Sequence, residues 1–176
     1  MPGSMTILGL DPGSRYTGFG VVAGSGSRVR LIDQGRIVLP PSRPLAERLG
    51  LLSRRLDEIL DRHRPDIAVL EGLFSGVNVR SLIVLAQARG ALLAALSRAE
   101  LEICEYTPSQ IKSAVTGSGR ADKEQVAKMV RMILGYRDEL SVDASDALAA
   151  AICCSQRAGI ERRVARSALG KRPVNR

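Results

Sequence analysis

The chain has 176 residues, 45% of them hydrophobic, which is enough for one domain with a full-sized core. Lys and Arg number 26 against 18 Asp and Glu, so the formal net charge is +8 and the pI is about 10.1, a balance that supports nucleic-acid binding. Because no apolar run approaches the roughly 20 residues of a membrane span and no secretory signal is visible, we expect a cytoplasmic protein with no membrane partner.

The first part of the chain predicts three consecutive strands. Residues 1–4 precede Met5 and are interpreted as a cloning remnant outside the fold. The turn at residues 11–14 and the Gly- and Ser-rich loop at residues 24–27 separate the three apolar segments, which indicates an antiparallel meander. The expected strands are residues 6–10, 17–22 and 29–39.

Helices and strands alternate after the meander. Strands are expected at residues 67–71 and 101–106, and helices at residues 44–63, 80–99, 108–115, 122–134 and 143–156, with Ser141 as the N-cap of the last helix. The resulting order, βββαβαβααα, predicts an α/β fold with one mixed five-stranded sheet, three strands antiparallel and the rest parallel, and helices on both faces. We expect a single domain over residues 5–157.

The C-terminal residues 158–176 are expected to form a basic, flexible tail. From residue 157 onward there are seven basic residues and one acid, Glu161, so this segment carries +6 of the net charge. It is either a solvated arm or an arm that contacts nucleic-acid phosphates, and the two interpretations are compatible.

Four carboxylates in three separate segments are the main candidates for chemistry. Asp11 and Glu71 each close a short apolar run that is typical of a buried strand, and Asp143 and Asp146 open an Ala-rich helix. A charge at the end of a buried strand is costly unless it is paired, and clustered acids repel one another. Hard divalent cations with oxygen ligands, Mg²⁺ or Mn²⁺, would relieve both costs.

The spacing of these acids also indicates a reaction. Asp143 and Asp146 share one helix face, and all four acids converge if the last helix crosses the sheet edge. Such a site can hold two divalent ions about 4 Å apart and support in-line displacement at a phosphodiester. Each acid alone could be a solvated cap or loop residue, but that interpretation is disfavoured for all four together.

Cysteine and histidine do not suggest a competing site. The three cysteines lack metal-ligand spacing and are expected to be buried, reduced thiols. The single histidine, His63, argues against a His-based zinc site, and we expect it to be solvated at a helix end.

Three cations and one aromatic are candidates for nucleic-acid contact. Lys112 and Lys123 flank a Gly-rich loop that contains Arg120; they are either surface charges, which spacing alone slightly favours, or phosphate clamps. Phe74 follows Glu71 by three residues in a Gly-flanked loop. It is either a core anchor, the usual case, or a wedge or stacking platform for a base.

These residues lie in segments that together resemble a known family. The segments read ILGLDPGSRYTG (residues 7–18), EGLF (71–74), QARG (87–90) and DASDALA (143–149), with Lys112 and Lys123 between the last two. In this order and spacing, from about residue 6 to residue 156, the chain resembles RuvC-type Holliday-junction resolvases of the RNase H-like superfamily.

The resemblance implies a site, a reaction and partners. It implies a homodimer, with residues 80–99 at or near its interface, that resolves four-way junction DNA by paired symmetric nicks and works with the RuvA–RuvB branch-migration complex. It implies two Mg²⁺ ions per site, replaceable by Mn²⁺. The metal-binding catalytic acids would be Asp11, Glu71, Asp143 and Asp146, and the DNA-binding residues Lys112, Lys123, Phe74, Arg80 and Arg120.

Three departures from the family pattern are visible. Gly72 stands where the family often has Gln, Val77 where it often has a basic residue, and Ala86 where Gly is usual. With Val77 apolar, Arg80 is the nearest cation after Phe74.

Three other functions compete with the nuclease interpretation. An ATP-binding domain of the actin and sugar-kinase type also has a strand, an Asp and a Gly-rich turn, but it needs two such domains. A non-catalytic nucleic-acid-binding module would explain the charge, although clustered acids would repel phosphate. A monomeric RNase H-like nuclease acting on RNA would differ in its dimer state and in its substrate.

Overall fold

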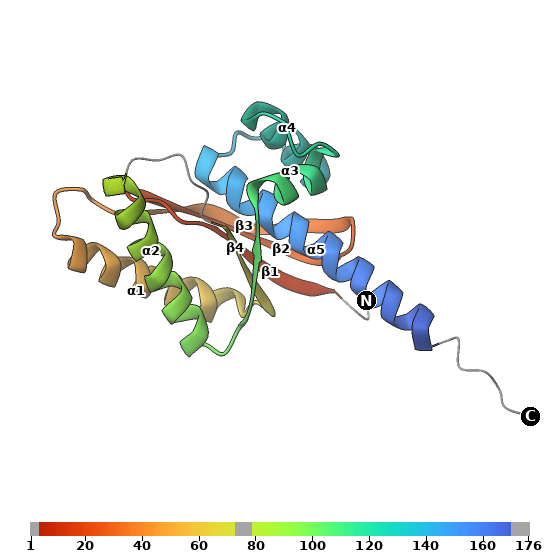
Figure 1. The fold of residues 1–176 in the computed structure, drawn as a ribbon, viewed down its shortest axis with the longest axis horizontal. Coiled ribbons are helices and arrows are strands. Elements are labelled where there is room, and N and C mark those ends of the chain that lie inside the picture. The colour runs from red at the N-terminus through yellow and green to blue at the C-terminus, as the bar shows by residue number, and fades with distance from the viewer. Residues whose placement is uncertain (1–3, 73–78, 170–176) are drawn as a thin grey trace, which may run out of the picture.

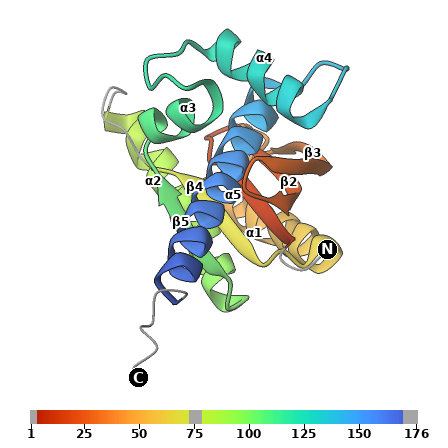
Figure 2. The same ribbon diagram turned by 90° about the vertical axis from the view of Figure 1, so that its right-hand side faces the viewer.

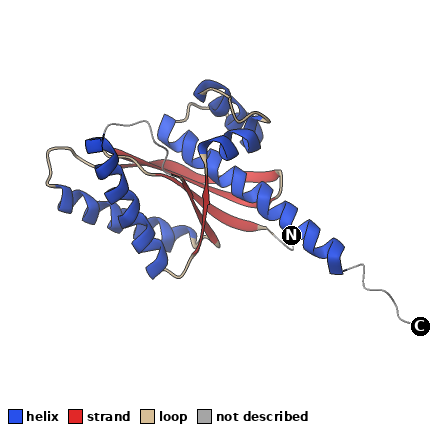
Figure 3. Cartoon of the chain, viewed as in Figure 1, coloured by secondary structure: helices blue, strands red, loops and turns tan. Residues whose placement is uncertain are grey.

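A computed structural model describes residues 4–72 and 79–169, with side chains except at residue 80 and beyond residue 158. The strands are β1 (Met5–Asp11), β2 (Tyr16–Ser25), β3 (Arg28–Val38), β4 (Ile67–Glu71) and β5 (Glu102–Tyr106). The helices are α1 (Leu45–His63), α2 (Val79–Arg98), α3 (Pro108–Thr116), α4 (Lys123–Leu134) and α5 (Val142–Leu169). This order confirms the predicted βββαβαβααα arrangement. Figure 1 shows the elements coloured along the chain, and Figure 3 separates helices from strands by colour.

All five strands form one sheet in the order β3-β2-β1-β4-β5. The β1–β2 and β2–β3 pairs are antiparallel, and the β1–β4 and β4–β5 pairs are parallel. The predicted mixed sheet is therefore confirmed. Because β1 and β4 run in parallel at its centre, both strands deliver their last residue to the same edge.

Alternation along the strands gives the sheet two apolar faces. Ile7 and Val69 pack in one core with α3, α4 and α5, whereas Leu8, Leu10 and Leu70 pack in the other with α1 and α2. Successive strand side chains point to opposite faces, so this division follows from the sequence. Figure 2 shows α5 crossing one face of the sheet, with α1 behind it on the other.

Glycines in the strands let α5 lie directly against the sheet. A Cβ atom at Gly9 would overlap the backbone of Ala147, and a Cβ atom at Gly18 would overlap the backbone of Asp143. These two positions of β1 and β2 can therefore hold only hydrogen where the helix passes. The close approach fixes the first turns of α5 over the sheet edge at which Asp11 emerges.

Capping residues fix where the next helices start. Thr107 at α3 and Asp122 at α4 each form a capping box, with Gln110 and Gln125 as the reciprocal partners. The Ser141 hydroxyl accepts a hydrogen bond from the Ala144 N–H at 3.3 Å, which confirms it as the N-cap of α5. These caps fix the starts of α4, which carries Lys123, and of α5, which carries Asp143 and Asp146.

The last helix is longer than predicted. It continues to Leu169, beyond the expected end at residue 156, so the first part of the expected tail has a helical backbone. Ala, Arg, Glu and Leu predominate after residue 156, and all four are strong helix formers.

Two further expectations are corrected. The His63 side chain, expected to be solvated, is only 11% exposed, and its Nε2 lies 2.8 Å from Asp33 Oδ2 on β3.

The segment Ser81–Arg98 of α2 is long and apolar enough, by length and composition alone, to cross a membrane, with 28% of it buried. Arg89 in its middle is buried within the domain, which favours a helix that packs on protein.

The cysteines follow the prediction more closely. All three are free; Cys153 and Cys154 are buried, and Cys104 is half-buried. Burial raises the pKa of the Cys153 and Cys154 thiols, in the latter case to about 12. These thiols are therefore protonated core residues rather than nucleophiles.

Candidate active site

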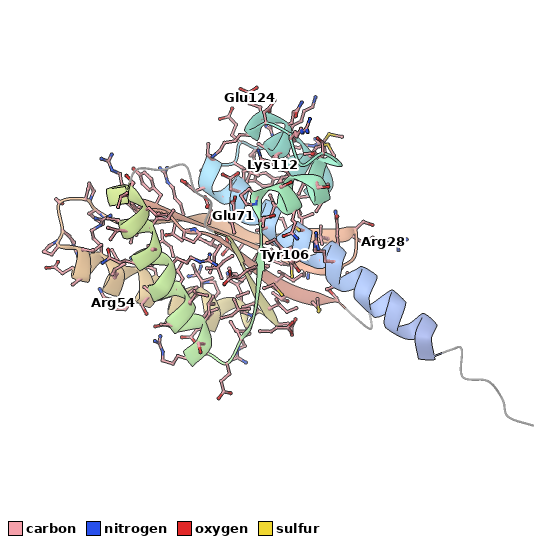
Figure 4. All side chains as sticks on the ribbon, in the orientation of Figure 1. Arg28, Arg54, Glu71, Tyr106, Lys112 and Glu124 are labelled. Atoms are coloured by element: carbon pink, nitrogen blue, oxygen red, sulfur yellow. The ribbon has the colours of Figure 1, made fainter. Side chains whose placement is uncertain are left out.

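A cleft of about 400 Å³ opens where β1, β4 and α5 meet. Three carboxylates from these three elements line it: Asp11, Glu71 and Asp146. Lys112 of α3 and Lys123 of α4 line the same cleft. Figure 4 shows Glu71 and Lys112 in this region, far from Arg54 on α1 and from Arg28. The fold thus brings five of the predicted site residues together from segments far apart in sequence.

Strand register explains why Asp11 and Glu71 meet. The β1–β4 pairing aligns Leu10 with Leu70, so Asp11 and Glu71 are the next residues of two parallel neighbours. Both follow the alternation of Ile7 and Val69 and therefore point to the α5 face. The apolar runs that precede the two acids set both their position and their direction.

The first turns of α5 supply the other two acids. Asp146 lines the cleft, whereas Asp143 does not belong to its lining. The charge of Asp143 nevertheless raises the pKa of both Asp11 and Asp146, so it belongs to the same electrostatic cluster. Both acids lie near the N-terminus of α5, where the helix dipole attracts negative charge.

The cluster strongly perturbs its own titration. Burial raises the pKa of Asp11 to about 8, and the charges of Asp146, Glu71 and Asp143 contribute in the same direction. Burial likewise raises the pKa of Glu71 and of Asp146. Carboxylates perturbed together by burial and by like charges are typical of functional sites.

Two lysines partly offset this repulsion. Lys123 Nζ lies 3.4 Å from Asp146 Oδ2, and this acid raises the pKa of the lysine. Lys112 lowers the pKa of both Glu71 and Asp146. Since the Lys123 side chain is 74% exposed, it can also meet an anion that enters the cleft from solvent.

The donor chemistry of the cleft fits a hard divalent cation. Its ionisable lining residues are three carboxylates and two lysines, with neither His nor Cys. Among the described residues, no group of three or more Asp, Glu, His or Cys side chains is placed closely enough, as the side chains stand, to hold a metal ion. The fit therefore rests on oxygen donors and on clustered negative charge, which Mg²⁺ and Mn²⁺ prefer.

Of the other predicted DNA-binding residues, Arg120 is described, and it does not belong to the cleft lining. Arg120 is exposed on the loop between α3 and α4, and its backbone N–H donates to Ser118 Oγ. The Arg80 side chain, Phe74 and Val77 lie outside the described residues.

Gly72, which departs from the family pattern, forms part of the cleft wall. Its N–H donates to the Tyr106 carbonyl at 2.8 Å. An added Cβ would lie 3.5 Å from that oxygen, an ordinary contact, so the backbone leaves room for a side chain here.

One residue next to the site was missed by reasoning from chemistry alone. Arg89 of α2 is 7% exposed and donates a hydrogen bond to the backbone carbonyl of Glu71 at 2.6 Å. The available signal was an arginine inside an otherwise apolar, small-residue helix. Such a charge needs a buried partner.

Comparisons with known proteins agree with this arrangement. The family model for crossover junction endodeoxyribonuclease RuvC matches residues 7–154. The RuvC of Alkalilimnicola ehrlichii is 48% identical over 161 residues, which are 92% of this chain and 97% of that protein. The RuvC of Anaeromyxobacter sp. (strain K) is 48% identical over 149 residues, 85% of this chain and 80% of that protein.

A solved structure gives the same result in three dimensions. The structure of T. thermophilus RuvC in complex with a Holliday junction substrate matches this fold with a TM-score of 0.85 at 35% identity, covering 89% of this chain and 96% of that one. The segment matched by the family model includes Asp11, Glu71 and Asp146. The chain therefore belongs to the RuvC family of crossover junction endodeoxyribonucleases.

Proposed function

We propose that this chain resolves four-way DNA junctions by paired, symmetric nicks, in homologous recombination and DNA repair. Membership of the family makes it a crossover junction endodeoxyribonuclease. The observation that carries the proposal is the cleft that Asp11, Glu71 and Asp146 line together with Lys112 and Lys123. An ATP-binding domain has no need of that acid cluster, and a purely binding module would be weakened by it.

The residues divide into two roles around one phosphodiester. Asp11, Glu71 and Asp146, with Asp143 beside them, would hold Mg²⁺, or Mn²⁺ in its place, as two ions per site. Bound ions supply an activated water and neutralise charge on the attacking and leaving oxygens. Lys112 and Lys123 would hold non-bridging phosphate oxygens and so keep the scissile bond over the acids.

The lysine role gives a testable consequence. Lys112→Ala or Lys123→Ala should slow single-turnover cutting about 10-fold or more, because each removes a cation that stabilises charge at the reacting phosphate. Each should also reduce the salt dependence of junction binding by about one unit of slope. Lys128→Ala is the matched control, since Lys128 is exposed on the same helix as Lys123 but does not line the cleft.

Single-turnover rates and binding at several salt concentrations check both effects. Variants at Lys112 and Lys123 that match Lys128→Ala in rate and in salt slope would return both lysines to the role of surface charge.

A face of α2 that is exposed among the described residues supports the homodimer. Ile83 is 53% exposed, and Ala86, Gly90 and Ala94 are exposed at helical spacing on the same side. A Cβ at Gly90 would meet nothing within 4 Å, so this side of the helix is open. Apolar and small side chains on an exposed face permit close packing against a second copy by two-fold symmetry, which would place two cutting sites on one junction.

Ala94→Glu should convert the protein to a monomer, because it places a charge in this α2 face. Ala46→Glu, at an exposed position in the first turn of α1, controls for the added charge. Light scattering after size-exclusion chromatography measures the state. A dimeric Ala94→Glu variant would show that another surface, or no surface, forms the dimer.

A plasmid that extrudes a cruciform tests the proposed reaction. Two nicks made within one binding event release linear DNA, whereas uncoordinated single nicks give open circles first. We expect linear product without accumulation of open circles, and sequencing should map the nicks to symmetric positions. Open circles as the main product would contradict paired cutting.

The remaining proposals follow from family resemblance. Phe74 would act as a wedge or stacking platform near the crossover, with Arg80 and Arg120 as further DNA contacts. The RuvA–RuvB branch-migration complex would be the protein partner, and the cytoplasm the site of action. A flexible tail over residues 158–176, and its contact with DNA, remain predictions.

A further inference from the structure

Among the side chains that the structure describes, Arg89 is the one charged residue that is buried. It lies on the side of α2 that faces the domain core, next to Ala88 and one turn before Leu92. Removing a guanidinium from water is costly unless its donors are matched by acceptors with good geometry. The hydrogen-bond and ion-pair partners of Arg89 should therefore indicate its role.

The guanidinium bridges the ends of two strands. One nitrogen, Nη1, donates a hydrogen bond to the backbone carbonyl of Glu71 on β4 at 2.6 Å. The other, Nη2, forms an ion pair of 2.6 Å with Glu105 Oε2 on β5. The Glu105 side chain is 52% exposed, so this partner is held between the domain and solvent.

These contacts fall where Glu71 enters the cleft. The β4–β5 register pairs Leu70 with Glu105 and Glu71 with Tyr106, and the Gly72 N–H donates to the Tyr106 carbonyl at 2.8 Å. The Glu71 carbonyl and the Gly72 N–H that follows it are therefore both hydrogen-bonded. The acid at the end of β4 is held from α2 on one side and from β5 on the other.

We propose that Arg89 is a positioning residue for the cutting reaction: it holds the backbone of Glu71 so that the carboxylate keeps its direction in the cleft, and Glu105 orients the guanidinium for this task. The inference rests on the proposed role of Glu71 as a catalytic acid. Arginine suits the task because its planar fork can reach two acceptors on different strands, which the single ammonium of lysine cannot reproduce.

The test uses Arg89→Met and Arg89→Lys, with Arg98→Met as the matched control. Arg98 lies on the same helix and forms an ion pair with Asp57 at 2.8 Å, away from Glu71. Each full-length variant is measured for single-turnover cutting of saturating junction, for junction affinity, for melting temperature, and for hydrogen exchange at the Gly72 amide.

We expect Arg89→Met to lower the cutting rate about 10- to 100-fold, the usual cost of losing a residue that orients a metal ligand. Junction affinity should stay within about twofold, since the buried Arg89 side chain leaves little surface for a phosphate contact. The Gly72 amide should exchange faster in Arg89→Met than in Arg98→Met. Arg89→Lys should recover only part of the rate at an unchanged melting temperature.

Three results would overturn the inference: Arg89→Met cutting as fast as Arg98→Met, a loss of affinity as large as the loss of rate, or unchanged exchange at Gly72. If Arg89→Met does not fold, Arg89→Lys decides, and a wild-type rate in that variant overturns the inference. Glu71→Gln separates a failure of the proposed catalytic role of Glu71 from a failure of the positioning role of Arg89. Normal cutting by Glu71→Gln contradicts the proposed catalytic role itself, whereas inactive Glu71→Gln beside fully active Arg89 variants contradicts only the positioning role.

Discussion

Asp11→Asn should abolish strand cutting and leave junction binding intact. Asp11 is the carboxylate that feels all three other acids of the cluster, and burial raises its pKa to about 8. Asparagine preserves the shape of the side chain but removes the charge that a divalent cation would need. We expect a loss of cutting of about 10³-fold or more, the scale of losing a principal group that stabilises charge in the reaction.

Labelled junctions measured by gel shift and by cleavage check both halves of this expectation. Asp138→Asn is the matched control, because Asp138 is an exposed acid on the loop before α5 and does not line the cleft. Normal cutting by Asp11→Asn would contradict the assignment of this acid to metal binding. A loss of binding equal to the loss of cutting would assign Asp11 to substrate recognition instead.

The same substitution should stabilise the fold when divalent cations are absent. Asp11 titrates near 3.8 when unfolded and near 8 in the folded protein. Between these pH values the folded state keeps a proton that the unfolded state has lost, so the free energy of unfolding falls as pH rises and levels off above pH 8. Asp11→Asn lacks this loss, and at pH 8 we expect it to be more stable than wild type by about 2 kcal/mol or more.

Denaturant unfolding in EDTA at pH 5 and at pH 8 measures this effect. The advantage of Asp11→Asn should be larger at pH 8, and Mg²⁺ should raise the melting temperature of wild type more than that of the variant. Equal stability of the two proteins at both pH values would show that Asp11 is not held in a repulsive, buried cluster. In that case the acids needed for cutting would not lower the free energy of unfolding.

The positions of the two strand-end acids could be predicted from sequence because they follow from local rules. A short apolar run buries its strand, and alternation assigns a face to the residue that ends it. Ile7 and Val69 therefore define the direction of Asp11 and Glu71 by alternation alone. Ser141 was likewise recognisable as an N-cap from its place before the acids of α5.

The convergence of α5 on those acids needed tertiary information. It depends on backbone contact at Gly9 and Gly18, where no side chain separates strand from helix. The two glycines are visible in the sequence, but no sequence pattern indicates that α5 is the element that packs against them. The two lysines were ambiguous for the same reason, since their spacing is compatible with any exposed helix face.

Arg89 and His63 show a further limit. Each finds an acceptor far along the chain, Glu71 and Asp33 respectively, and periodicity within one element cannot identify such a partner. Both side chains are largely buried, although a charged or titratable residue near a helix end or in an apolar helix is usually solvated. A polar residue inside an apolar pattern is therefore a reason to search for a partner on a neighbouring element.

The most direct test is cleavage of a mobile four-way DNA junction with Mg²⁺ or with EDTA, beside linear duplex of the same sequence and an RNA–DNA hybrid. We predict paired nicks confined to the junction, present with Mg²⁺ and lost in EDTA. Cutting that survives EDTA, or that occurs only in the RNA-containing strand, would contradict a metal-dependent junction resolvase built on Asp11, Glu71 and Asp146.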